Sequence, residues 1–91
     1  MKKHLVKSLR EVPVVCVEWN DTTSFDEWMP YARARHLAFA RCRTVGHLLA
    51  RNRRGDLTIA GLLGPDDGPD SQVGQVIRIP GSYVAKVRRL R

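Results

Sequence analysis

Cysteine is scarce in this chain, and no long hydrophobic run is present. Cys16 and Cys42 are the only two cysteines in 91 residues, too few for the disulfide framework of a small secreted domain. Both lie in apolar runs, where buried free thiols are expected. No apolar stretch approaches the roughly 20 residues that a membrane span needs. The first residues are basic but have no continuous apolar region or small-residue cleavage site, so we do not expect a signal peptide.

Motifs for metal binding and catalysis are also missing. Cys16, His36, Cys42 and His47 form no CxxC or HxxxH pair. Cys42 and His47 have opposite parity within one predicted strand, so their side chains are expected to face apart. Cys42 lies in mid-strand rather than in an exposed electropositive turn, where a cysteine nucleophile is activated. We therefore expect no metal site, no cofactor and no enzymatic activity.

Charge is abundant and unevenly placed. Sixteen Lys and Arg against nine Asp and Glu give a net charge of +7, which attracts polyanions or acidic protein surfaces. Residues 11–32 and 64–76 contain acids but no base, so the remaining segments are strongly basic. This bipolar pattern is consistent with head-to-tail docking of like molecules, with an anion held on the basic face, or with solvated charge that has no specific partner.

Short β-like runs separated by turn signals dominate what is present. Residues 12–19 are rich in β-branched side chains, and Pro13 predicts the beginning of a strand or a sheet edge. Gly46 predicts a bend in the next run. The later strands are expected at residues 41–51, 57–63, 75–79 and 83–90. This spacing predicts a mainly β fold, a five-stranded bent antiparallel sheet or barrel of SH3 or Sm type.

The size of the chain predicts one domain, with a small barrel at residues 12–91. Residues 1–11 are expected to form a basic arm or a helical turn. The Gly, Pro and Asp residues of segment 64–74 predict a flexible acidic loop. A core of this size is often marginal alone, and edge strands pair readily between subunits, so we expect a homo-oligomer.

Residues 20–40 are expected to form a helical or irregular insertion after the first strand. Ser24 and Glu27 have the spacing of a capping box, which predicts a short helix that Pro30 interrupts. The following residues, 31–40, fit either a helix or a strand. We expect Trp19 and Trp28 to pin the insertion against the barrel, although aromatics exposed beside arginines would instead indicate base stacking.

Several motifs resemble a group of small, uncharacterised phage-encoded proteins over roughly residues 14–90. The shared features are an early tryptophan, a first strand that ends at Trp-x-Asp, a Cys-x-Thr-Val-Gly-x-Leu strand and a closing Ile-Pro-x-x-x-Val segment. They correspond to Trp28, Trp19–Asp21, Cys42–Leu48 and Ile79–Val84. This resemblance implies a phage accessory protein that acts in the cytoplasm of a bacterial host, and it implies no particular activity.

A wider resemblance is to the Sm-like barrels, whose first motif has Gly-x-Leu followed by an Asp and an Asn. Gly46 and Leu48 match it, but Asn52 stands in the Asp position and Asp56 in the Asn position. In the second motif, Ile-Arg-Gly, Pro80 replaces the Arg. The resemblance implies a barrel that assembles into a ring, whereas these departures put the family's uridine site in doubt.

Two basic segments are the candidate binding site. Arginine makes bidentate contacts with phosphate, and the cationic residues gather in a predicted hairpin loop and in the last strand. The candidate contacts to nucleic acid or nucleotide are Arg51, Arg53, Arg54, Lys86, Arg88 and Arg89. Trp28 and Tyr83 are the candidates for stacking on a base. If the last strand lies near residues 41–51, then Arg41, Arg43 and Arg88 share one basic face.

Two alternative functions fit the same residues. The chain could be an anti-defence inhibitor that docks on a host protein through its basic face and its aromatic residues. It could also trap a nucleotide immune signal in a pocket between subunits. The sequence does not separate these alternatives from nucleic-acid binding.

Overall fold

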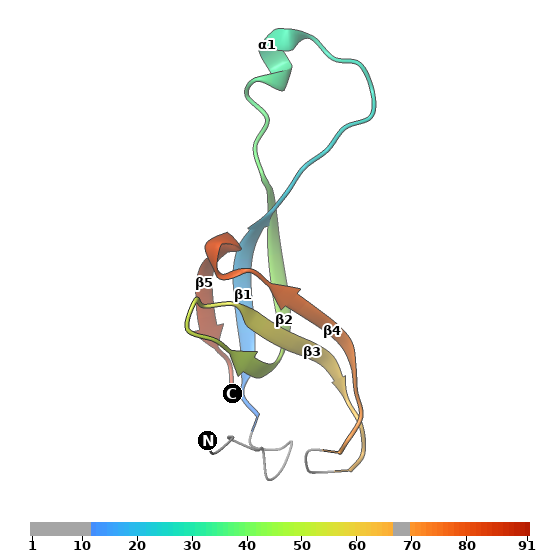
Figure 1. Cartoon of the computed structure of the whole chain (residues 1–91), viewed down its shortest axis with the longest axis vertical. Helices are drawn as coiled ribbons and strands as arrows, with labels where there is room; N and C mark the ends of the chain where they lie inside the picture. Colours follow the sequence, from blue (N-terminus) through green and yellow to red (C-terminus); the bar gives the residue numbers. More distant parts are fainter. Residues whose placement is uncertain (1–11, 67–69) are drawn as a thin grey trace.

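The computed structural model describes residues 12–66 and 70–91. The expected basic arm at residues 1–11 and part of the acidic loop, residues 67–69, lie outside the described residues. The described chain contains five strands in one open antiparallel sheet (Figure 1). The strands are β1 (Val14–Asp21), β2 (Ala40–Arg51), β3 (Leu57–Leu63), β4 (Val73–Ile79) and β5 (Val84–Arg89). The mainly β prediction is therefore confirmed.

The strand order in the sheet is β4-β3-β2-β1-β5. Strand β1 lies between β2 and β5, so the first strand of the chain pairs with the last one. The predicted bounds of β3 agree with the structure to the residue, and those of the other strands differ by one or two residues. Pro13 stands just before β1, where its missing N–H costs no ladder hydrogen bond.

The core lies on one face of this bent sheet. Val17, Leu57, Ile59 and Ile79 are its fully buried large side chains. Trp19 is 9% exposed and packs with them, while its indole Nε1–H donates to Thr44 Oγ1 at 2.9 Å. A buried indole N–H needs such a partner, so this bond fixes the orientation of the ring.

A single turn of 3-10 helix, Gly81–Tyr83, joins β4 to β5. Pro80 precedes it, and the Tyr83 N–H donates to the Pro80 carbonyl at 2.9 Å. This 3-10 turn redirects the chain across the sheet (Figure 1). This redirection brings β5 to the free edge of β1.

The connection between β1 and β2, residues 22–39, projects from the end of the sheet and is called the arm below (Figure 1). The predicted helix at Ser24 is wrong, because residues 22–30 have no regular secondary structure. One helical turn, α1 (Tyr31–Ala34), begins only after Pro30, which removes the hydrogen bond that an earlier helix would need. The arm contributes to the long dimension of the molecule, which measures 54 × 26 × 25 Å.

The prediction that Trp28 pins the insertion against the barrel is wrong. Trp19 lies in the core, but Trp28 is fully exposed and pins nothing. Few contacts close the arm; one is the hydrogen bond from Thr23 Oγ1 to the Ala38 carbonyl at 2.6 Å. In the part of the chain that the structure describes, no helix is long and apolar enough to cross a bilayer.

Candidate functional site

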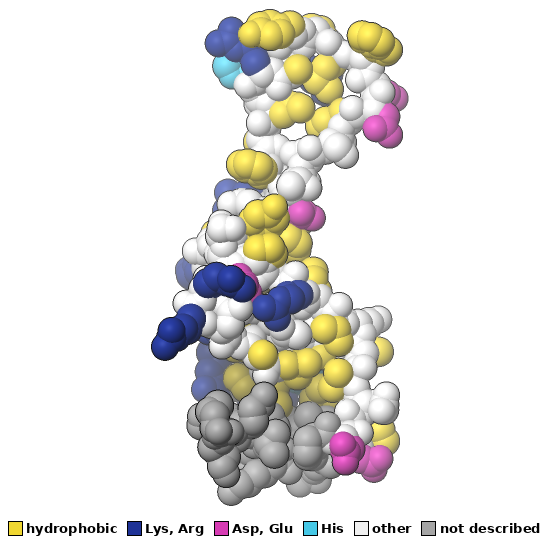
Figure 2. All heavy atoms as spheres, viewed as in Figure 1, with side chains coloured by type: hydrophobic (Ala, Val, Ile, Leu, Met, Phe, Trp, Pro, Cys, Tyr) yellow, Lys and Arg dark blue, Asp and Glu magenta, His cyan; other side chains and the backbone are white. Residues whose placement is uncertain are grey.

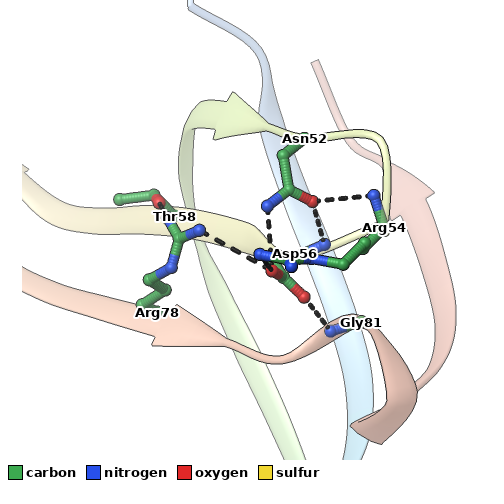
Figure 3. A network of polar contacts seen from close by, with 6 residues as sticks. All are labelled: Asn52, Arg54, Asp56, Thr58, Arg78 and Gly81. Atoms are coloured by element: carbon green, nitrogen blue, oxygen red, sulfur yellow. Dashed lines mark hydrogen bonds and ion pairs between the residues drawn. The ribbon is translucent and has the colours of Figure 1, made fainter.

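The turn between β2 and β3 is held by its own polar side chains (Figure 3). The Asn52 side-chain oxygen accepts the backbone N–H groups of Arg54 and Asp56, at 3.0 and 2.9 Å. The Asn52 amide nitrogen donates to Asp56 Oδ2 at 2.8 Å. Gly55 completes the turn with a φ of +85°, a conformation that glycine adopts without strain. Asn52 and Asp56, the residues at the Sm-motif positions, therefore bond to each other within the loop.

Asp56 also ties this turn to the link between β4 and β5. Its Oδ1 accepts the Gly81 backbone N–H at 2.6 Å, and Arg54 and Arg78 lie 3.4 and 3.7 Å from Oδ2. The Asn52 hydrogen bond, the Gly81 N–H and the two guanidinium groups lower the pKa of Asp56 below its ordinary 3.8, against a smaller opposing effect of burial. Asp56 thus remains ionised and engages Arg54, one of the predicted anion contacts.

Gly81 allows the two segments to come this close. A Cβ atom at Gly81 would lie 2.9 Å from the Gly55 carbonyl carbon and closer still to the Arg54 carbonyl oxygen. These are backbone atoms, which cannot rotate aside as a side chain can. Glycine at position 81 is therefore required for the packing between these two loops.

The outer face of β1, opposite the core, carries a different cationic group. Glu18 pairs with Arg43 of β2 on one side and with Lys86 of β5 on the other. Likewise, Cys16 pairs with Arg88 of β5, and Asn20 pairs with Arg41 of β2. Directly paired residues of antiparallel strands point to the same side of a sheet. Four exposed cations therefore share what we call the outer basic face, made of Arg41, Arg43, Lys86 and Arg88.

Few acidic side chains lie close enough to neutralise the cations of the outer basic face. In residues 12–66 and 70–91, the ion pairs within 4.0 Å join Asp56 to Arg54 and to Arg78. None of the four cations of the outer basic face takes part in them. Glu18 is the one acid that the register places among them. Strands lie about 4.8 Å apart, so Arg43 and Lys86 are separated by about 10 Å across β1. Such a row of solvated cations attracts a polyanion.

The six predicted anion contacts do not form one site. Lys86 and Arg88 belong to the outer basic face, whereas Arg53 and Arg54 lie in the β2–β3 turn. Arg51 and Arg89 line a cleft of about 480 Å³ near the beginning of β1, and Lys86 also borders it. The apolar part of this cleft includes Val15, Leu48, Val84 and Val87.

The stacking candidates are also separated. Trp28 lies on the arm and is fully exposed, while Tyr83 is half-buried against the core. Tyr83 lines a small pocket of about 170 Å³ with Asn20, Phe39 and Ser82. Asn20 pairs with Arg41, so this pocket lies beside the outer basic face. Phe39, at 68% exposed, adds an aromatic surface to the two predicted stacking residues.

The sequence prediction also left Arg41 and Arg43 out of the principal site. Their alternation with Cys42 and Thr44 was a usable signal, because it placed both arginines on one face of a strand. The missing information was the position of β1 between β2 and β5. Only that pairing brings Arg41 and Arg43 onto the same surface as Lys86 and Arg88.

Comparison with known proteins supplies no further assignment. No protein-family model, no curated protein and no solved structure matches this chain. Within the described residues, no three His, Cys, Asp or Glu side chains are grouped so that they could hold a metal ion. The functional inference therefore depends on the outer basic face and the aromatic pocket beside it.

Proposed function

We propose that this chain is a non-enzymatic module that binds single-stranded nucleic acid on the outer basic face. The observation that carries the proposal is the double pairing of β1, which gathers Arg41, Arg43, Lys86 and Arg88 on one exposed surface. Arginine and lysine on such a surface neutralise successive phosphates, and this electrostatic contact needs no particular base sequence.

The aromatic residues beside this face favour a single strand over a duplex. Proteins that hold single strands combine a basic track with aromatic rings on which bases stack. Phe39 and Tyr83 line the 170 Å³ pocket next to Arg41, and the Asn20 side chain is available to a base edge there. This volume is below the roughly 300 Å³ of pockets that enclose small molecules, which favours one base of a polymer over a free nucleotide.

The arrangement of strands supports an SH3-type barrel as the scaffold of this surface. Five bent antiparallel strands with β1 between β2 and β5, and a 3-10 turn before the last strand, agree with the small-barrel prediction. In this proposal the barrel interior is filled by the core, so the ligand lies on the outside of the sheet.

Salt-dependent binding of a labelled oligonucleotide tests the proposal. Fluorescence anisotropy with a 20-nucleotide oligodeoxythymidine should show a slope of log K against log salt of about −3, from four phosphate contacts at about −0.7 each. The double variant Arg43→Glu/Lys86→Glu should weaken binding at least tenfold at low salt and reduce the slope to about −1.5. A duplex of the same length should bind more weakly than the single strand.

The matched control is Arg33→Glu/Arg53→Glu, which reverses the same number of charges on the arm and in the β2–β3 turn. Its loss of affinity should be smaller, because neither residue lies on the outer basic face. Absence of binding at low salt, or an equal loss in both double variants, would show that the outer basic face is not the site.

A further inference from the structure

The arm exposes more apolar surface than an isolated protein normally leaves in water. Phe25, Trp28, Tyr31 and Phe39 are 52, 101, 78 and 68% exposed, and all four lie on this one connection. Hydrophobic side chains are visible at several places on the surface of the arm (Figure 2). Single exposed apolar residues are ordinary, but four exposed aromatic residues on one short connection indicate an interaction surface. Tyr31 is held by Arg35, whose guanidinium lies 5.9 Å from the ring centre.

We propose that the tip of the arm docks into the cleft beside β5 of a second copy of this chain. The cleft has the composition that an indole flanked by acids requires. Its apolar wall includes Val15, Leu48 and Val87, and Arg51 and Arg89 stand among its polar lining. Its volume of about 480 Å³ lies within the range of pockets that bury sizeable aromatic groups.

The first half of the arm is complementary in charge to the cleft, whereas Arg33 and Arg35 lie in its second half. Asp26 and Glu27 directly precede Trp28, all three are exposed, and residues 12–32 contain no Lys or Arg. Arg51, Lys86 and Arg89 all line the cleft. Within the described segments, the ion pairs join Asp56 to Arg54 and Arg78, so these three cations have no acidic partner among the described residues. Complementary charges around an apolar anchor orient a docking contact and exclude wrong registers.

No residue of the arm lines the cleft of its own molecule. The arm leaves the sheet after Asp21, at the end of β1, and extends away from it (Figure 1). The cleft lies along β5, from Val84, which pairs with Trp19, to Arg89, which pairs with Val15 near the beginning of β1. With the arm extended in this direction, the contact forms between molecules.

A contact between different surfaces of two identical chains is heterologous, so it leads to a ring or an open chain of subunits. One aromatic anchor with its acidic neighbours buries less than about 1,200 Å² in total, which is the range of weak, transient complexes. The association should thus depend on concentration, and salt should weaken it. This inference goes beyond the proposed function, because it concerns Arg51 and Arg89 rather than the outer basic face.

Sedimentation of the full chain over a range of concentrations measures this association. We expect the mean mass of the wild type to rise with concentration beyond that of a dimer. Trp28→Ala should weaken the association about tenfold or more, the effect of removing a central aromatic anchor. Leu62→Ala is the control, because Leu62 is also an exposed hydrophobic residue, at 55%, but lies on β3 and should leave the association unchanged.

Charge exchange then tests whether the arm meets this cleft. Asp26→Lys/Glu27→Lys and Arg51→Glu/Arg89→Glu should each abolish association, whereas a chain that carries all four changes should associate again. A wild-type chain that stays monomeric at the highest concentration overturns the proposal and assigns the arm to a different protein partner. Failure of the fourfold variant to recover, with circular dichroism showing a folded chain, overturns the pairing of arm and cleft.

This experiment is independent of nucleic-acid binding. Lys86 borders both surfaces, so it is left unchanged in the cleft variant. A wild-type chain that binds the oligonucleotide but stays monomeric would remove the inference and leave the proposed function intact. A chain that self-associates but does not bind the oligonucleotide would remove the proposed function alone.

Discussion

The two connections that flank β2 are built in opposite ways. The turn at residues 52–56 uses Asn52 and Asp56 to bond its own backbone, and Asp56 reaches further to Gly81. The arm at residues 22–39 joins β1 to the same strand but has few internal bonds, and its aromatic rings face solvent. The hydrogen bonds of the turn stabilise the fold, whereas the arm has few contacts that could stabilise it. A segment that is left this exposed is more readily explained by a contact outside the chain.

The largest effect is expected where the turn meets the 3-10 segment. Gly81→Ala places a methyl group against the backbone of Arg54 and Gly55, neither of which can move without breaking the Asp56 network. We expect a loss of about 3 kcal/mol in the free energy of unfolding, at the upper end for overpacking. Urea denaturation followed by tryptophan fluorescence measures it.

Gly74→Ala provides the comparison within the same sheet. A Cβ atom there would lie 3.5 Å from Leu62 Cδ1, an ordinary contact. Its free energy of unfolding should stay within about 0.5 kcal/mol of the wild type. Equal destabilisation by both substitutions would mean that the close approach of Gly81 to the turn is unimportant.

The turn could be anticipated from the sequence better than the arm could. Asn-Arg-Arg-Gly-Asp between two β-branched runs has a local mechanism, because Asn and Asp bond nearby backbone groups and Gly supplies the positive φ. The capping box at Ser24 has an equally local mechanism and yet forms no helix. Pro30 follows too soon for the helix to extend beyond its costly first turn.

The candidate surface was less predictable than either connection. Strand alternation assigned Arg41 and Arg43 to one face, but no local signal states which strands become neighbours. The pairing of β1 with β5 joins residues from the two ends of the chain. Trp28 shows the same limit, because an indole is suited both to a core and to an interface. Composition alone could not distinguish the buried Trp19 from the exposed Trp28.

A smaller effect, visible mainly in its pH dependence, is expected for Asp56. Its folded-state pKa lies below the ordinary 3.8 of the unfolded chain. The ionised carboxylate therefore stabilises the fold above about pH 4, and this contribution disappears as the pH falls through the folded-state value. Asp56→Asn should lower the melting temperature at pH 7, by less than Gly81→Ala, and should flatten the decline of stability below pH 4.

Thermal unfolding between pH 2.5 and 7 measures this difference. Asp70→Asn, which removes a carboxylate from the connection between β3 and β4, is the control and should melt with the wild type at pH 7. If Asp56→Asn melted with the wild type over the whole range, the network in the turn would contribute nothing to stability, and the contrast with the arm would disappear.

The smallest effect on stability is expected when the arm is removed. Asp21 and Ala40 are directly paired at the ends of β1 and β2, so an Asn-Gly dipeptide can replace residues 22–39 as a two-residue hairpin loop. The arm buries no large side chain in the core, and a shorter loop closes at a lower entropic cost. The melting temperature should therefore be unchanged or higher. Self-association should be lost, while the outer basic face should still bind the oligonucleotide, with reduced affinity because Phe39 is gone. A shortened chain that unfolds would instead assign the arm to the fold, and its exposed aromatic rings would then need a different explanation.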